Sequence, residues 1–113
     1  MFDENRFQEV LSTVGNDGMT LLLSMLIAEL SEAPLKIGNL VYCGAVLSAR
    51  KEAHSLKGAA EAVGAFDLAG SALVLEQQLS NERDAIPSFR TLAAVAIQTR
   101  REAEDRLIAL RSH

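Results

Sequence analysis

The sequence has few residues of the kinds that build sheets or interrupt helices. It has no tryptophan, only 4% aromatic residues, two prolines and seven glycines among its 113 residues. Alanine and leucine are the commonest apolar residues, and the apolar share is 49%. This composition favours an all-α protein over a sheet protein, and the length fits a single domain over residues 1–113.

The sequence also has a single cysteine, Cys43, and no excess of basic residues. One cysteine cannot form an internal disulfide, and no set of Cys and His residues has metal-ligand spacing. We therefore expect a small, buried, apolar Cys43 and no metal site. The net charge is -4 with a pI of about 5.1. Because a broad basic surface is missing, a nucleic-acid partner is not expected.

Long apolar runs are missing as well. The longest run covers residues 21–28, which falls short of the roughly 20 residues that a membrane-spanning helix needs. The N-terminus is acidic and shows no signal-peptide pattern. We expect a soluble, cytoplasmic protein without a membrane partner.

Apolar residues recur at helical spacing in segments separated by turn signals, such as GNDG at 15–18 and YCGA at 42–45. The predicted helices span residues 3–12, 17–41, 45–63, 66–80 and 87–111. Pro34 is expected to kink or restart the second of these, and Gly38 to weaken its end. Four long amphipathic helices with short connections predict an up-and-down antiparallel four-helix bundle, with the first short helix as a cap.

The helix predicted over 45–63 carries one histidine outside a seam of mostly small residues. The seam residues are Ala49, Ala53, Leu56, Ala60 and Val63. His54 lies off this seam and is expected to be exposed. Three cations, Arg50, Lys51 and Lys57, fall on or near the same face. Gly58 costs about 1 kcal/mol relative to alanine in a helix, which makes sense if a partner must approach the backbone beside the histidine.

The stretches AHSLKGAAEAVGA and LAGSALVLE resemble the signature of histidine-containing phosphotransfer (HPt) domains. The resemblance implies a four-helix bundle in which His54 is the exposed phosphoacceptor and attacks through Nε2. It implies that Lys57 pairs with phosphoryl oxygens and that Gly58 permits a receiver domain to dock. Glu76 matches a position where the family often carries Gln or Glu, and its carboxylate could hold Nδ1–H of the ring.

The resemblance also implies the partners. These are response-regulator receiver domains and a hybrid histidine kinase, with a phosphoryl group passing between receiver aspartates and His54. The receiver would supply Mg²⁺, so no intrinsic cofactor is expected, and a monomer is favoured. No Gly-rich ATP loop is present, so the protein is expected to relay a phosphoryl group rather than to take one from ATP.

Helix geometry adds candidate partner contacts. Arg50 and Lys51 could attract an acidic receiver pocket, with a strength that falls as salt rises. Glu61 lies seven residues after His54 on the same face, where it could repel phosphate or select partners. Leu21 and Met25, together with Ala28, lie off the buried stripe of their helix and form a candidate apolar docking patch beside His54.

Two other interpretations stay open. The chain could be the HPt module of a hybrid or chemotaxis-type kinase, although its start at Met1 and its complete set of helices favour a whole small protein. It could instead be a helical adaptor with an inert histidine, which would bind partners through the helix predicted over 17–41.

Overall fold

The structure, a computed structural model, describes residues 1–81 and 83–112. Within these residues it contains only helices and no strand, which confirms the all-α prediction. The four helices are α1 (Glu4–Tyr42), α2 (Val46–Val63), α3 (Phe66–Ser80) and α4 (Ile86–Arg111). The bounds of the last three lie within one residue of the predicted ones, because glycines or short polar links end each predicted segment.

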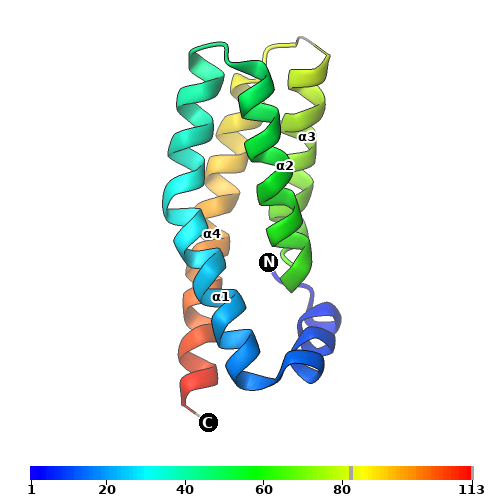
Figure 1. Cartoon of the computed structure of the whole chain (residues 1–113), viewed down its shortest axis with the longest axis vertical. Coiled ribbons are helices and arrows are strands. Elements are labelled where there is room, and N and C mark those ends of the chain that lie inside the picture. Colours follow the sequence, from blue (N-terminus) through cyan, green and yellow to red (C-terminus); the bar gives the residue numbers. More distant parts are fainter. Residues whose placement is uncertain (82, 113) are drawn as a thin grey trace.

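The helices lie side by side along the long axis of an elongated bundle (Figure 1), whose extents are 47 × 21 × 18 Å. Each helix packs against two others: α1 against α2 and α4, and α3 against the same two. The α1–α2 and α3–α4 links lie together at one end of the molecule (Figure 1). The core between the helices is dominated by leucine and alanine, and its largest fully buried side chains are Met19, Leu23, Ile37, Leu56, Leu68, Leu75, Leu92 and Val63.

The inner face of α2 consists of the five residues that the sequence analysis assigned to its seam. Ala49, Ala53, Leu56 and Ala60 are all 0% exposed. Three of these four are alanines, so α2 can approach its neighbours closely along most of its length. The rotation of α2 about its own axis is therefore fixed by packing, and the residues that face solvent follow from it.

The break predicted at GNDG, between a first short helix and a second long one, is present within α1. Two helical segments within Glu4–Tyr42 meet at a sharp kink at Gly15, where φ is 75° and ψ is 178°. Glycine adopts this positive φ without the steric cost that a side chain would add. The helix passes through Pro34 with helical backbone angles, so the proline does not end it. By length and composition alone, α1 is also apolar enough to cross a membrane.

Residues 1–14, here called the N-terminal arm, pack across the turn between α2 and α3 and onto α4. The backbone N–H of Asp3 donates to the carbonyl oxygen of Gly64 at 2.8 Å, and that of Phe2 donates to Glu102 Oε2 at 2.6 Å. The guanidinium of Arg106 lies 4.5 Å from the ring centroid of Phe7. It also pairs with the carboxylates of Glu4 and Glu102. The arm is therefore held by apolar burial and by backbone hydrogen bonds together.

Two links depend on glycines with positive φ, Gly44 at 74° and Gly64 at 83°. A Cβ on Gly64 would also lie 3.0 Å from Cβ of Arg6 in the N-terminal arm, so the turn needs glycine for space as well as for its backbone angles.

The expectation of a buried Cys43 is wrong, because this residue is exposed at the C-terminal end of α1. The sequence places it one residue past the last helical turn, where no neighbouring helix covers it.

Gly38 and Gly70 provide a matched test of this packing. A Cβ on Gly38 would lie 2.6 Å from Cζ of Phe89, whereas a Cβ on Gly70 would meet nothing within 4 Å. We expect Gly38→Ala to destabilise the bundle by about 1 kcal/mol net, because overpacking exceeds the gain in helix propensity. Gly70→Ala should stabilise it by about 0.5–1 kcal/mol. Urea denaturation followed by circular dichroism measures both, and a Gly38→Ala protein as stable as wild type would contradict the packing described here.

Candidate functional site

His54 lies on the outer face of α2, and its side chain is 66% exposed. The residues that fix this orientation are its neighbours Ala53 and Leu56, both fully buried. Because consecutive positions on a helix differ by about 100°, burying these two side chains leaves the imidazole facing outward. The exposure predicted from the sequence is therefore what the structure shows.

The carboxylate of Glu76, on α3, links the histidine to a lysine. Oε1 of Glu76 lies 3.3 Å from Nδ1 of His54 and 3.8 Å from Nζ of Lys57. A carboxylate only accepts hydrogen bonds, so this contact is made when the proton sits on Nδ1. That tautomer leaves the lone pair on Nε2, the nitrogen that points away from Glu76. Glu76 and Lys57 are only 22% and 21% exposed, so their positions are restrained by packing.

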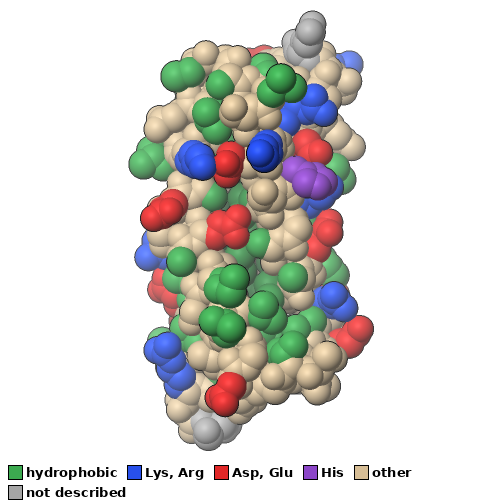
Figure 2. Space-filling model, viewed as in Figure 1, with side chains coloured by type: hydrophobic (Ala, Val, Ile, Leu, Met, Phe, Trp, Pro, Cys, Tyr) green, Lys and Arg blue, Asp and Glu red, His purple; other side chains and the backbone are tan. Residues whose placement is uncertain are grey.

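The imidazole opens onto a shallow recess of about 460 Å³. Its lining residues are Leu47, Arg50, Lys51, His54, Ser55 and Glu76. Figure 2 shows the histidine in a row of charged side chains across the upper part of this face. The structure thus brings together two of the three predicted cations in this recess and leaves Lys57 outside it, on the other side of the histidine.

Gly58 lies one turn beyond His54 and is exposed. A Cβ built on it would meet no atom within 4 Å, so nothing in the part of the chain that the structure describes requires a glycine there. The helix-propensity cost of this glycine therefore has no explanation in the packing of the bundle. The unused space lies on the outside of α2, beside the imidazole.

The other predicted partner residues are exposed but lie farther from the histidine. Lys36 and Glu52 form a 3.0 Å ion pair, so these two residues lie at about the same level on α1 and α2. By this register His54 is level with position 34, which puts Met25 about 14 Å and Leu21 about 20 Å away along the bundle at 1.5 Å per residue. Ala28, the nearest residue of this apolar patch, is about 9 Å away on the same scale, so the patch begins between one and two turns from the histidine. Glu61 is exposed on α2, between the histidine and Met25 along the bundle.

Leu47 and Ser55 were missed by the sequence analysis. Leu47 is 77% exposed and lies two helical turns before His54, at the spacing that places both residues on one face. Ser55 follows the histidine directly and contributes a hydroxyl to the recess. Leu47 could have been found from the sequence, because it is an apolar residue that lies outside the buried seam and seven residues before the histidine.

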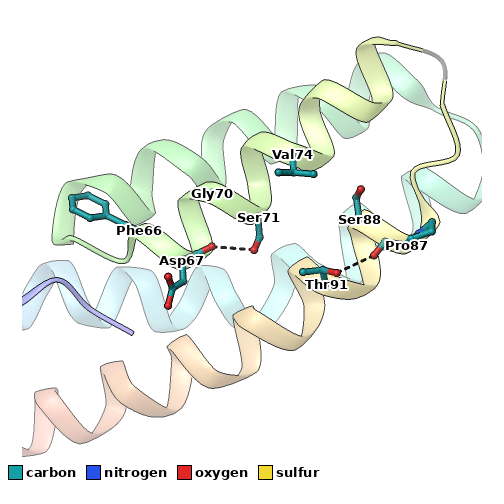
Figure 3. A pocket seen from close by; sticks show the side chains of 8 residues that line it. All are labelled: Phe66, Asp67, Gly70, Ser71, Val74, Pro87, Ser88 and Thr91. Carbon is teal, nitrogen blue, oxygen red and sulfur yellow. Dashed lines mark hydrogen bonds between the residues drawn. The ribbon is translucent and has the colours of Figure 1, made fainter.

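Among the described residues, the other hollows of the bundle contain no imidazole. A groove of about 520 Å³ between α3 and α4 is lined by the residues that Figure 3 labels, among them Phe66, Gly70 and Val74, and carries one carboxylate, that of Asp67. A second, of about 510 Å³, lies between α1 and α4. Among residues 1–81 and 83–112, no three His, Cys, Asp or Glu side chains gather as a metal site would require. His54 is thus the candidate reactive group.

A comparison with protein-family models matches the Hpt domain over residues 21–113. No curated protein and no solved structure matches the chain. The matched range contains α2, α3 and α4 whole, together with the part of α1 from residue 21 onward. It therefore contains each of the residues that surround His54.

The carboxylates of Glu29 on α1 and Glu52 on α2 repel each other. Burial, together with the charge of Glu52, raises the pKa of Glu29 above its ordinary value of 4.5. A raised carboxyl pKa means that the folded state loses stability as pH rises from 4.5 through the folded-state pKa. We therefore expect Glu29→Gln to raise the melting temperature at pH 7 and to have little effect near pH 4.

Circular dichroism melts at the two pH values measure this difference. Glu32→Gln is the control, because Glu32 is an exposed carboxylate on the same helix. A Glu29→Gln protein that melts at or below the wild-type temperature at pH 7 would contradict the destabilisation expected from burial of the Glu29 carboxylate and from the charge of Glu52.

Proposed function

Because the chain belongs to the Hpt domain family, whose role is histidine phosphotransfer in two-component signalling, we propose that it relays a phosphoryl group between receiver-domain aspartates and His54. The observation that carries the proposal is the exposed imidazole of His54 with its Nδ1 beside Glu76. This contact supports a tautomer whose Nε2 is free to attack. No step of this relay requires ATP to bind to the bundle.

In the proposed reaction, the Nε2 lone pair of His54 attacks phosphorus of an aspartyl-phosphate. The N–P bond forms, the bond between phosphorus and the aspartyl oxygen breaks, and the aspartate leaves as a carboxylate. The ring then carries positive charge, which the Nδ1–H contact with Glu76 stabilises. The return step runs the same path backward to another aspartate, so the bundle contributes a positioned nucleophile.

Lys57 has the proposed role of pairing with phosphoryl oxygens, and its amino group lies on the same side of α2 as the histidine ring. Arg50 and Lys51 would attract the acidic pocket of a receiver. Gly58 would let the receiver approach the backbone, and the open space around its Cα supports this. Leu21 and Met25, at the edge of such a footprint, and Glu61 are the proposed determinants of which receiver binds.

The proposal includes the finer features of fold and setting. The short links and the packing of each helix against two others support an up-and-down antiparallel order, with the N-terminal arm as a cap. The partners would be response-regulator receivers and a hybrid histidine kinase, with Mg²⁺ supplied by the receiver. We further propose a cytoplasmic monomer.

The central test is phosphate transfer from a phosphorylated receiver. We expect wild type to acquire acid-labile, base-stable phosphate and His54→Gln to acquire none, because no other imidazole lies in the matched helices. Lys57→Ala should slow transfer about 10-fold while keeping helicity, because one charged contact to the phosphoryl group is lost. Radiolabelled gels and circular dichroism measure these outcomes.

A wild-type protein that no receiver of its source organism labels would favour the inert adaptor. Equal labelling of His54→Gln would show that the phosphoacceptor lies elsewhere. Loss of helicity in Lys57→Ala would make the lysine a structural residue.

Gly58→Ala separates docking from chemistry. The added methyl meets nothing in the bundle, so the fold should be kept, yet it fills the space through which a receiver would approach. We expect transfer from a phosphorylated receiver to slow about 10- to 100-fold, while labelling by the small donor phosphoramidate stays unchanged.

Gly70→Ala is the matched control, since Gly70 is also helical, exposed and open, but lies on α3 in the groove of Figure 3. Its transfer rate should equal that of wild type. If both variants transfer at the wild-type rate, the receiver does not approach over Gly58.

A further inference from the structure

The recess beside His54 lies toward the N-terminal end of α2. Lys57 lies outside it, so the role proposed for Lys57 does not account for the recess. The recess is lined by Arg50, Lys51 and Ser55 together with the imidazole. Arg50 precedes His54 by one turn, so the two side chains are neighbours on the helix surface. A group attached to Nε2 of His54 would project outward from the ring beside this recess and the guanidinium that lines it.

Lys57 and Arg50 differ in what they contact. The amino group of Lys57 lies 3.8 Å from the carboxylate of Glu76, so its charge already has an acidic neighbour. Nε of Arg50 is buried and has no hydrogen-bond acceptor among residues 1–81 and 83–112. Its charge is therefore not bound through Nε to an acidic neighbour, and Arg50 lines the recess in which an anion would lie.

We propose that Arg50 binds the phosphoryl group of phosphorylated His54 and prolongs its lifetime. This inference rests on the proposed function and adds a second phosphoryl-binding cation to it. A guanidinium presents several N–H donors in a plane and matches two phosphoryl oxygens at once, which an ammonium does not. Arg50 then acts on the phosphorylated protein itself, before any receiver arrives.

The direction of the effect follows from the chemistry of hydrolysis. Water attacks phosphorus, the N–P bond breaks, and inorganic phosphate leaves with the imidazole regenerated. The transition state is loose and resembles metaphosphate, whose three oxygens share less negative charge than those of the dianionic phosphoryl group. A cation on these oxygens therefore stabilises the phosphorylated state more than the transition state, and hydrolysis slows.

The test uses phosphoramidate as donor, so that no receiver is present. Full-length wild type and variants are phosphorylated, freed of donor, and followed by ³¹P NMR as the phosphohistidine signal decays. We expect Arg50→Gln to shorten the lifetime about three- to tenfold and Arg50→Lys to restore part of it. Arg90→Gln is the matched control: it removes the same charge by the same substitution from an exposed position on α4, a helix that does not pack against α2, and should stay within about twofold of wild type.

The outcomes separate the possible failures. If Arg50→Gln decays at the wild-type rate but accepts phosphate more slowly from a receiver, Arg50 only attracts the partner and the proposal is overturned. Equal shortening in Arg90→Gln would mean a general loss of charge, which also overturns it. If Arg50→Gln loses helicity, Arg50→Lys decides, because its aliphatic stem keeps the packing: a wild-type lifetime and unchanged ³¹P shift overturn the proposal. Wild type that neither phosphoramidate nor a receiver can label means that the proposed function itself fails.

Discussion

The packing of α2 is the constraint on which the site depends. Its buried face is a line of alanines with Leu56 and Val63, and these close contacts permit only one rotation of the helix. Every outward group on α2, from Leu47 to Glu61, takes its direction from this rotation. The core therefore determines the chemistry without contributing a reactive atom, and a helix with bulkier inner residues would present a different set of side chains to solvent.

α3 provides the second half of the site through a single carboxylate. Glu76 is partly shielded and lies near both an imidazole and an ammonium, so its negative charge is shared between two donors. The cations on α2 then divide into two groups, one on each side of the ring. An acidic protein thus carries a local concentration of positive charge where an anion would bind, although its net charge is -4.

Much of the fold and part of the site could be predicted because their signals are local. The seam of α2 and the glycines after α1 and α2 depend on helical periods and turn chemistry within a few residues. The exposure of His54 follows from the same period. The contact between His54 and Glu76 was expected only by family resemblance, since 22 residues separate the two. The folding of the N-terminal arm onto Arg106, the exposed Cys43 and the distance of Met25 from the histidine depend on tertiary packing, which no local pattern encodes.

The turn at Gly64 has a consequence for how this domain can vary. His54 and Glu76 lie on opposite arms of the α2–α3 hairpin and meet because each is eleven residues from Ala65. One residue inserted into α3 before Glu76 would rotate the carboxylate by about 100° and advance it by 1.5 Å, away from the ring. The length of this hairpin is therefore coupled to its chemistry, whereas a longer α3–α4 link would leave the pair intact. Insertions and deletions in functional relatives should concentrate in that link and be absent between the histidine and the glutamate.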